Sequence, residues 1–172
     1  MIDYTTILNF WFPKSECGFL KFWFSAESDN YIIKNFKHQL DELENTQEIS
    51  FINEEDLLAK IIVLDQFSRN IYRGTTDIIK NDKKALNLAV LFFEKDYHIN
   101  KNFNKVIFAL MPFRHSENII DQEFVLNILK LFQDDSELYK KFYSASLKSY
   151  NTIKKYGYFP TRKNLKKPIL ME

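Results

Sequence analysis

Residues that break helices are scarce in this chain, and the apolar residues between them recur at helical spacing. The 172 residues include only 3 Gly and 4 Pro, too few for many tight hairpins or long irregular loops. Val, which favours strands, is also rare. The 17 Phe and 9 Tyr predict a core built largely from aromatic rings. These features predict an all-α fold in a single helical domain over residues 1–172.

About seven helices follow from the positions of caps, breakers and apolar stripes. Pro13 ends the first helix, Gly157 ends the last, and Asn53 with three acidic residues after it opens the third. We expect Pro112 to break or kink the fifth helix and Ser116 to cap the sixth. Because short links join consecutive helices, neighbours should pack antiparallel in an array. The predicted ranges are 3–12, 28–44, 53–73, 82–93, 102–111, 116–132 and 136–156.

Cysteine usage and hydropathy favour a cytoplasmic protein. Cys17 is the one cysteine, so the chain forms no internal disulfide and offers no cysteine cluster for a metal. No basic-then-apolar leader opens the chain, and no run of about 18 apolar residues could span a bilayer. We therefore expect a cytoplasmic location and no membrane contact.

Charge is unevenly distributed, although the net charge is only +1. Residues 1–139 carry 15 basic and 22 acidic side chains, whereas residues 140–172 carry 9 basic and 1 acidic. Such asymmetry, with Lys and Tyr interleaved, can mark a nucleic-acid contact. A basic helix docked on an acidic body, or a solvated face, explains it as well, and we favour that interpretation. Nucleic acid is therefore not an expected partner.

In the third predicted helix, charged residues continue an apolar stripe. Asp65 and Arg69 follow Leu58 and Ile62 on one face, and Arg73 comes one turn later. The three charged residues would form a ladder of ion pairs. The helix is apolar around most of its circumference and should be central. Its charged groups then need partners, because unpaired buried charge is costly.

The sixth predicted helix carries two carboxylates on the face of its apolar stripe. Glu117 and Asp121 lie in its first turns, and His115 directly precedes them. Carboxylates with a histidine can do acid–base work, which makes these three candidate catalytic residues of a hydrolase. Alternatively, the carboxylates neutralise Arg69 and Arg73 across a helix pair, which we favour from the residues alone. The spacing matches no standard metal site, so we expect no metal and no cofactor.

Arginine is confined to a few positions. The chain has 20 Lys but only four Arg, at 69, 73, 114 and 162. Arginine offers a planar, bidentate donor that matches carboxylate and phosphate, which Lys does not. The distribution predicts either internal ion pairs with Asp and Glu or recognition of a small anion. We expect an anion pocket to be lined by Arg69, Arg73, His115 and Arg162.

Several segments resemble a known family. LDQFSRNIYRGT at 64–75, MPFRHSENIIDQE at 111–123 and KYGYFPTR at 155–162, with ILNFWF at 7–12, are similar to the domain-of-unknown-function family 924. The resemblance covers about residues 7–162. It implies an all-helical fold related to the tetratricopeptide-repeat-like superfamily, mostly in bacteria, with no established activity to carry over. From the family's recurring polar positions we take these candidate ligand-binding residues: Asp65, Gln66, Arg69, Asn70, Arg73, His115, Glu117, Gln122 and Arg162.

The end of the chain departs from the pattern that this resemblance implies. In relatives, the corresponding C-terminal segment usually has a sequence similar to HRDIIARFGRFPHRN. A Gly-Arg pair and a short acidic helix follow it. Here Ser149 and Thr161 stand where His is expected, Tyr158 replaces an Arg and Lys163 an Asn. Residues 158–172 form this divergent segment, in which Lys167-Pro168 replaces the Gly-Arg. If the family's activity needs those groups, it is lost or altered in this chain.

Three functions are compatible with the sequence. The first is binding of a small anionic ligand, a phosphate or carboxylate, by the arginine-containing site. The second is a tetratricopeptide-repeat-like scaffold that binds a protein partner through a concave groove. The third is a hydrolase that uses Glu117, Asp121 and His115 as acid and base. We take the first as the leading hypothesis, while the ligand, the reaction and the oligomeric state stay open.

Overall fold

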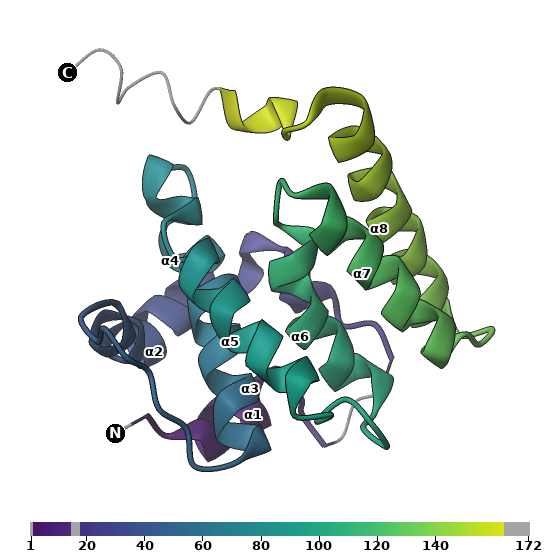
Figure 1. The fold of residues 1–172 in the computed structure, drawn as a ribbon. Coiled ribbons are helices and arrows are strands. Elements are labelled where there is room, and N and C mark those ends of the chain that lie inside the picture. The colour runs from purple at the N-terminus through teal and green to yellow at the C-terminus, as the bar shows by residue number, and fades with distance from the viewer. Residues whose placement is uncertain (1, 15–17, 164–172) are drawn as a thin grey trace.

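Helices make up the framework of the chain in the computed structural model, which describes residues 2–14 and 18–163 (Figure 1). The described residues contain no strand. Cys17 and residues 164–172, with Lys167 and Pro168, lie outside them. The α-helices are α1 (Tyr4–Trp11), α2 (Asp29–Glu44), α3 (Glu54–Ile62), α4 (Ser68–Ile71), α5 (Asp82–Glu94), α6 (Phe103–Arg114), α7 (Ile119–Leu129) and α8 (Glu137–Tyr156).

The all-α prediction and the number of helices are confirmed. A turn of π-helix, Val63–Phe67, joins α3 to α4, so these two segments form the third helix that the sequence predicts. Short 3₁₀ turns fill several of the links between helices. They cover Lys21–Phe24, Ala26–Ser28, Thr76–Ile79, Lys130–Phe132 and Pro160–Arg162.

Side-chain caps begin several helices where the sequence places them. The Asn53 side chain accepts a hydrogen bond from the backbone N–H of Asp56 at the start of α3. The Ser136 hydroxyl does the same for Tyr139 in α8. Gly157 ends α8 with a φ of 77°, in the left-handed region that favours glycine.

Two predicted helix boundaries are wrong. Pro112 does not break α6, which continues to Arg114. A proline so near the end of a helix removes one backbone donor, and Met111 and Phe113 beside it stay buried in the core. Ser116 does not cap α7. Asn118 caps it instead, through a hydrogen bond from the backbone N–H of Ile120 to its side-chain oxygen.

The core forms around α3, as its apolar circumference predicts. This helix packs against α1, α5 and α6, and its residues 56–59, 61 and 62 are buried. Aromatic rings fill the space between α6 and the N-terminal segments. The Phe108 ring centroid lies 5.3 Å from that of Trp11 and 5.0 Å from that of Trp23. The Trp23 indole N–H donates to the Trp11 carbonyl oxygen over 2.8 Å, so the buried pair is also tied by a hydrogen bond.

The C-terminal half ends in a helix pair. Helix α8 packs along α7 and against α6, and the segment after Gly157 turns back over the ends of the neighbouring helices (Figure 1). Among the described helices, none combines the length and the apolar character that crossing a bilayer requires.

Replacing Phe108 by Ala should lower the free energy of unfolding by about 3–5 kcal/mol, because the change leaves a cavity between two tryptophans. Chemical denaturation followed by circular dichroism measures this loss. Leu131→Ala is the control, since its side chain is 69% exposed and its loss should stay within about 0.5 kcal/mol. Similar losses in the two variants would contradict the central role of the aromatic cluster.

Candidate functional site

The π-helical turn brings a carboxylate into the core. The backbone N–H of Ser68 bonds to the Val63 carbonyl, five residues back, which inserts one extra residue into the helix. Asp65 lies in this turn with 0% of its side chain exposed. Turns of this kind inside α-helices are frequent at functional sites, so the position of Asp65 directs attention to its neighbours.

Three side chains surround the Asp65 carboxylate. Gln66 Nε2 donates to Oδ2 over 2.6 Å, and His115 Nδ1 lies 2.8 Å from Oδ1. Arg69 Nη1 lies 3.6 Å from Oδ1 and donates to the main-chain oxygen of Asp65 over 2.9 Å. Burial acts to raise the Asp65 pKa. The charge that His115 carries in the acid range where Asp65 titrates, the charge of Arg69 and these hydrogen bonds lower it to about 2. Asp65 is therefore ionised at neutral pH.

Arg69 also binds a second carboxylate. Its Nη1 and Nη2 donate to the two oxygens of Asp82, over 2.8 and 3.1 Å. Asp82 is the first residue of α5, where the helix dipole favours a negative charge. Nothing in the sequence near Arg69 indicated this bidentate pair, because Asp82 belongs to a different helix. The pair joins α4 to α5 at the edge of the core.

Arg73 lies in a different polar cluster. The predicted ladder from Asp65 to Arg69 is present, but its extension to Arg73 is wrong because α4 ends at Ile71. Arg73 Nε donates to Asp29 over 2.7 Å, and the Arg73 side chain is 43% exposed. Asn70 Nδ2 donates to the same carboxylate over 2.8 Å. Two of the candidate ligand-binding residues thus bind Asp29 of α2.

The two carboxylates of the predicted sixth helix have other partners, so their predicted pairing with Arg69 and Arg73 is wrong. Glu117 accepts a hydrogen bond from the backbone N–H of Phe159 over 2.6 Å, and its other oxygen lies 3.7 Å from Arg162 Nη1. Asp121 accepts a hydrogen bond from the Ser116 hydroxyl. Glu117 thereby holds the segment that follows α8.

Arg162 fixes this segment to the end of α6. Its Nη2 donates to the main-chain oxygen of His115 over 2.8 Å and lies 3.6 Å from Asp82 Oδ2. Its guanidinium carbon lies 4.8 Å from the centroid of the Phe159 ring. Gln122 Nε2 donates to the main-chain oxygens of Arg114 and Ser116, over 2.7 and 2.8 Å. The carbonyl groups at the end of α6 are therefore bonded by side chains from two other segments.

A cavity of about 370 Å³ lies where these segments meet. Three of the four arginines of the chain line it, and His115 lies among them. Ile78, Ile79 and Phe159 supply apolar wall, and the hydroxyl-bearing Ser149 and Thr161 complete the lining. Of the predicted ligand-binding residues, Arg69, His115 and Arg162 line the cavity, whereas Gln66, Asn70, Arg73 and Gln122 do not. Asp65 and Glu117 bind lining residues from outside it.

Arg114 also lines the cavity, although it was not among the predicted ligand-binding residues. The sequence feature that could have identified Arg114 is that it is one of only four arginines in the chain. Within residues 2–14 and 18–163, no carboxylate lies within ion-pair distance of its guanidinium, whose carbon stands 5.4 Å from the centroid of the Phe142 ring. Burial lowers the Arg114 pKa, while the charge of Asp65 acts in the opposite direction. Arginine nevertheless stays protonated at neutral pH.

His115 is held in a neutral state. Burial and the charge of Arg69 lower its pKa, against the opposing effect of Asp65. Nδ1 faces Asp65, and in the described part of the chain Nε2 has no hydrogen-bond partner. The imidazole therefore presents one bonded and one unbonded nitrogen.

Oxygen and nitrogen ligands for a cation come close together at one point. Donor atoms of Asp65, Asp82 and His115 lie within 4.8 Å of one another. The Arg69 guanidinium bonds the Asp82 carboxylate and lies 3.6 Å from that of Asp65, so it supplies the positive charge there. A metal ion would have to displace Arg69, and we do not assign a metal site to these residues.

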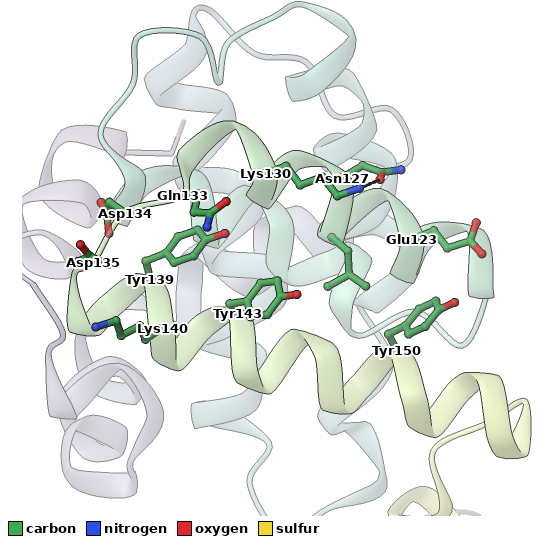
Figure 2. Close-up of a pocket in the computed structure, with 11 residues that line it drawn as sticks. Glu123, Asn127, Lys130, Gln133, Asp134, Asp135, Tyr139, Lys140, Tyr143 and Tyr150 are labelled. Atoms are coloured by element: carbon green, nitrogen blue, oxygen red, sulfur yellow. Dashed lines mark hydrogen bonds between the residues drawn. The ribbon is translucent and has the colours of Figure 1, made fainter.

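A larger hollow lies over α7 and α8, away from these residues. It measures about 840 Å³, and Figure 2 shows three tyrosines of α8 on its wall, Tyr139, Tyr143 and Tyr150. Glu123 and Asn127 of α7 and Lys130 of the following 3₁₀ turn line the other side. None of the residues singled out for ligand binding in the sequence lines this hollow. Its charged lining residues are of both signs, namely Glu123, Lys130, Asp134, Asp135 and Lys140, whereas the arginine cavity gathers three cations. We take the arginine cavity as the candidate site.

Comparison with known proteins identifies the family. The model of the family described as bacterial protein of unknown function (DUF924) matches residues 7–167, nearly the whole chain. The chain belongs to the DUF924 family. A solved structure, that of the protein of unknown function ATU0120 from Agrobacterium tumefaciens, superposes with a TM-score of 0.74 at 22% identity, covering 94% of this chain and 88% of that one. No curated protein matches. The structural similarity supports the DUF924 fold, and the relation to tetratricopeptide repeats stays a prediction.

Of the described positions that are expected to depart from the pattern of relatives, two line the cavity. They are Ser149 and Thr161. The other two, Tyr158 and Lys163, contact each other, with the Lys163 ammonium 5.3 Å from the centroid of the Tyr158 ring. Neither Ser149 nor Thr161 takes part in the contacts that join Asp65, Arg69 and His115.

Arg69→Met should lower the free energy of unfolding by about 3–5 kcal/mol, because it leaves the buried Asp65 and its neighbour Asp82 without their shared cation. Urea denaturation at neutral pH measures the loss. Arg73→Met is the matched control, since its exposed pair with Asp29 should contribute about 1 kcal/mol or less. Equal losses would show that the Asp65–Arg69–Asp82 group is not a main stabilising contact.

The free energy of unfolding should fall in two steps as pH decreases. The folded-state pKa of His115 lies below its ordinary 6.5, so the unfolded chain binds the proton first and stability falls below about pH 6.5. The pKa of Asp65 is lowered from 3.8 to about 2, so its contribution is lost as pH falls from 3.8 towards 2.

Denaturation of wild type and His115→Gln across this pH range measures the first step. The wild type should lose more stability than the variant between pH 7 and pH 5. Parallel pH profiles would contradict a lowered His115 pKa.

Proposed function

We propose that the cavity binds a small anionic ligand, a carboxylate or a phosphate, on Arg114 and Arg162. The observation that carries this proposal is the convergence of three arginines on one cavity, where Arg114 meets no carboxylate from the described residues. In a chain with 20 Lys and only four Arg, this clustering supports a need for the planar guanidinium.

The ion pairs around the cavity support the same proposal. Asp82 bonds Arg69 over 2.8 Å, and Asp65 adds a second negative charge 3.6 Å from it. Arg162 shares Asp82 and Glu117 at 3.6 and 3.7 Å, longer than a strong ion pair. Arg114 adds a positive charge that none of these three carboxylates bonds. An anion in the cavity would accept hydrogen bonds from its guanidinium.

The walls of the cavity favour binding of a small anion over simple hydration. Ile78, Ile79 and Phe159 are apolar and lower the local dielectric constant, which strengthens the attraction between an anion and the guanidinium groups. The volume of about 370 Å³ lies at the lower end of the range for small-molecule sites. A compact carboxylate or phosphate therefore suits this space.

The alternative functions stay predictions. A protein-binding scaffold would use an exposed groove, and the hollow over α7 and α8 is the available candidate (Figure 2). For a hydrolase that uses Glu117 and Asp121, the hydrogen bonds of these carboxylates to Phe159 and Ser116 would have to be exchanged during the reaction. A cytoplasmic location and the absence of a nucleic-acid partner also stay predictions.

Arg114→Met should weaken anion binding about 10- to 100-fold, since a charge-assisted hydrogen bond contributes about 1.5–3 kcal/mol. Calorimetric titration of the full chain with inorganic phosphate and with succinate measures this change. Arg73→Met, which lies outside the cavity, should bind as wild type does. The proposal fails if wild type binds neither anion saturably, or if Arg114→Met binds both with unchanged affinity.

A further inference from the structure

The imidazole of His115 is bonded on one side and open on the other. Nδ1 lies 2.8 Å from the fully buried Asp65 carboxylate, while the ring lines the cavity. Among the described residues, Nε2 has no partner. One nitrogen is thus fixed from within the core, and the other is available to a molecule in the cavity.

The Asp65 carboxylate determines which nitrogen carries the proton. An ionised carboxylate can only accept, so Nδ1–H donates to Asp65 and Nε2 keeps its lone pair. Gln66 holds the second carboxylate oxygen, which limits rotation of the group. Arg162 bonds the main-chain oxygen of His115. The ring is therefore held in one tautomer and one orientation.

The base and the unpaired cation are consecutive residues that line the same cavity. Arg114 is the last residue of α6, and His115 follows it. An anion held by Arg114 in this cavity would share the cavity with the His115 ring. A proton taken up by Nε2 gives an imidazolium that the Asp65 carboxylate stabilises on the opposite side of the ring.

We infer that His115 is the general base of a hydrolytic centre for small anionic esters, with Asp65 as its positioning residue. The place of the anion rests on the function proposed above, whereas the role of His115 rests on its own geometry. Arg114 has no carboxylate partner among the described residues, and one such arginine suits the one negative charge of a carboxylate-bearing ester. Ser149 and Thr161 line the cavity but make no hydrogen bond to His115, so water is the nucleophile.

The reaction balances with water alone. The water oxygen bonds to the acyl carbon of the ester as Nε2 takes its proton. The bond between the acyl carbon and the alcohol oxygen then breaks, and Nε2 returns the proton to that oxygen. The products are a carboxylic acid and an alcohol, and His115 is restored.

Two probes that differ at one end test the centre in the full chain. Mono(4-nitrophenyl) succinate carries a carboxylate where 4-nitrophenyl butyrate carries a methyl group. The carboxylate of the succinate ester accelerates its spontaneous hydrolysis, so the rate without protein is subtracted for each ester. Wild type should then hydrolyse the succinate ester at least tenfold faster than the butyrate ester in kcat/KM. His115→Gln should lose about 100-fold or more with both esters. Arg114→Met should reduce kcat/KM for the succinate ester at least tenfold, so that the two esters become similar substrates.

A spectroscopic readout separates positioning by Asp65 from a purely structural role. In wild type, the ¹⁵N spectrum of His115 at neutral pH should show a protonated Nδ1 and an unprotonated Nε2. In Asp65→Asn, the amide can donate to Nδ1, so the proton should move to Nε2 and kcat should fall while KM stays similar. Unchanged tautomer and kcat in a folded Asp65→Asn protein would overturn the positioning role.

Chemical modification of wild type keeps the test independent of any folding defect in His115→Gln. Diethyl pyrocarbonate should modify His115 at Nε2, and succinate should slow this modification. The inference is overturned if His115 resists modification, or if folded His115→Gln hydrolyses both esters as fast as wild type. If His115→Gln is inactive but Arg114→Met keeps the succinate preference, the base stands and the anion site on Arg114 fails.

Discussion

The polar contacts around the candidate site depend on one fully buried carboxylate, that of Asp65. Asp65 has no exposed surface, and removing an ionised group from water is costly unless other groups bond it. Its partners come from the following turn of its own helix and from the end of α6. Through Arg69 the same network reaches Asp82 at the start of α5, and through Asp82 it reaches Arg162 near the end of the described chain. The ion pairs that begin at the Asp65 carboxylate thus join segments that lie nearly one hundred residues apart in the sequence.

The main features of the fold could be predicted from the sequence because they depend on local signals. Asn53, Ser136 and Gly157 act at the helix ends they mark, and the apolar circumference of residues 57–64 correctly predicts a central helix. The π-helical turn could not be predicted, because apolar spacing does not distinguish an inserted residue within a continuous helix. Pro112 was misleading for a related reason: its burial in the core outweighs one missing backbone donor.

The candidate site was only partly predictable, because ion pairs between helices depend on tertiary contacts. Arg69, His115 and Arg162 were found from their residue types and motifs, and they line one cavity. The partners Asp82 and Asp29 were missed, since no spacing rule relates them to Arg69 or Arg73. Arg73 was assigned to the wrong cluster because helical spacing was extended past the end of α4. Arg114 was missed for a different reason. Arginine occurs at only four positions, including 114, but Arg114 was not part of the predicted ladder of ion pairs.

The position of Arg114 explains how the fold can carry an arginine without a carboxylate partner. It is the last residue of α6, and the carboxyl end of a helix carries a partial negative charge that favours a cation. The Phe142 ring lies 5.4 Å away and adds a weaker attraction. These contacts stabilise the charge but leave its bidentate donors unused, unlike those of Arg69, which bond Asp82. An anion could therefore bind to Arg114 and leave without breaking an ion pair on which the fold depends, and such reversibility is what a binding or catalytic site needs.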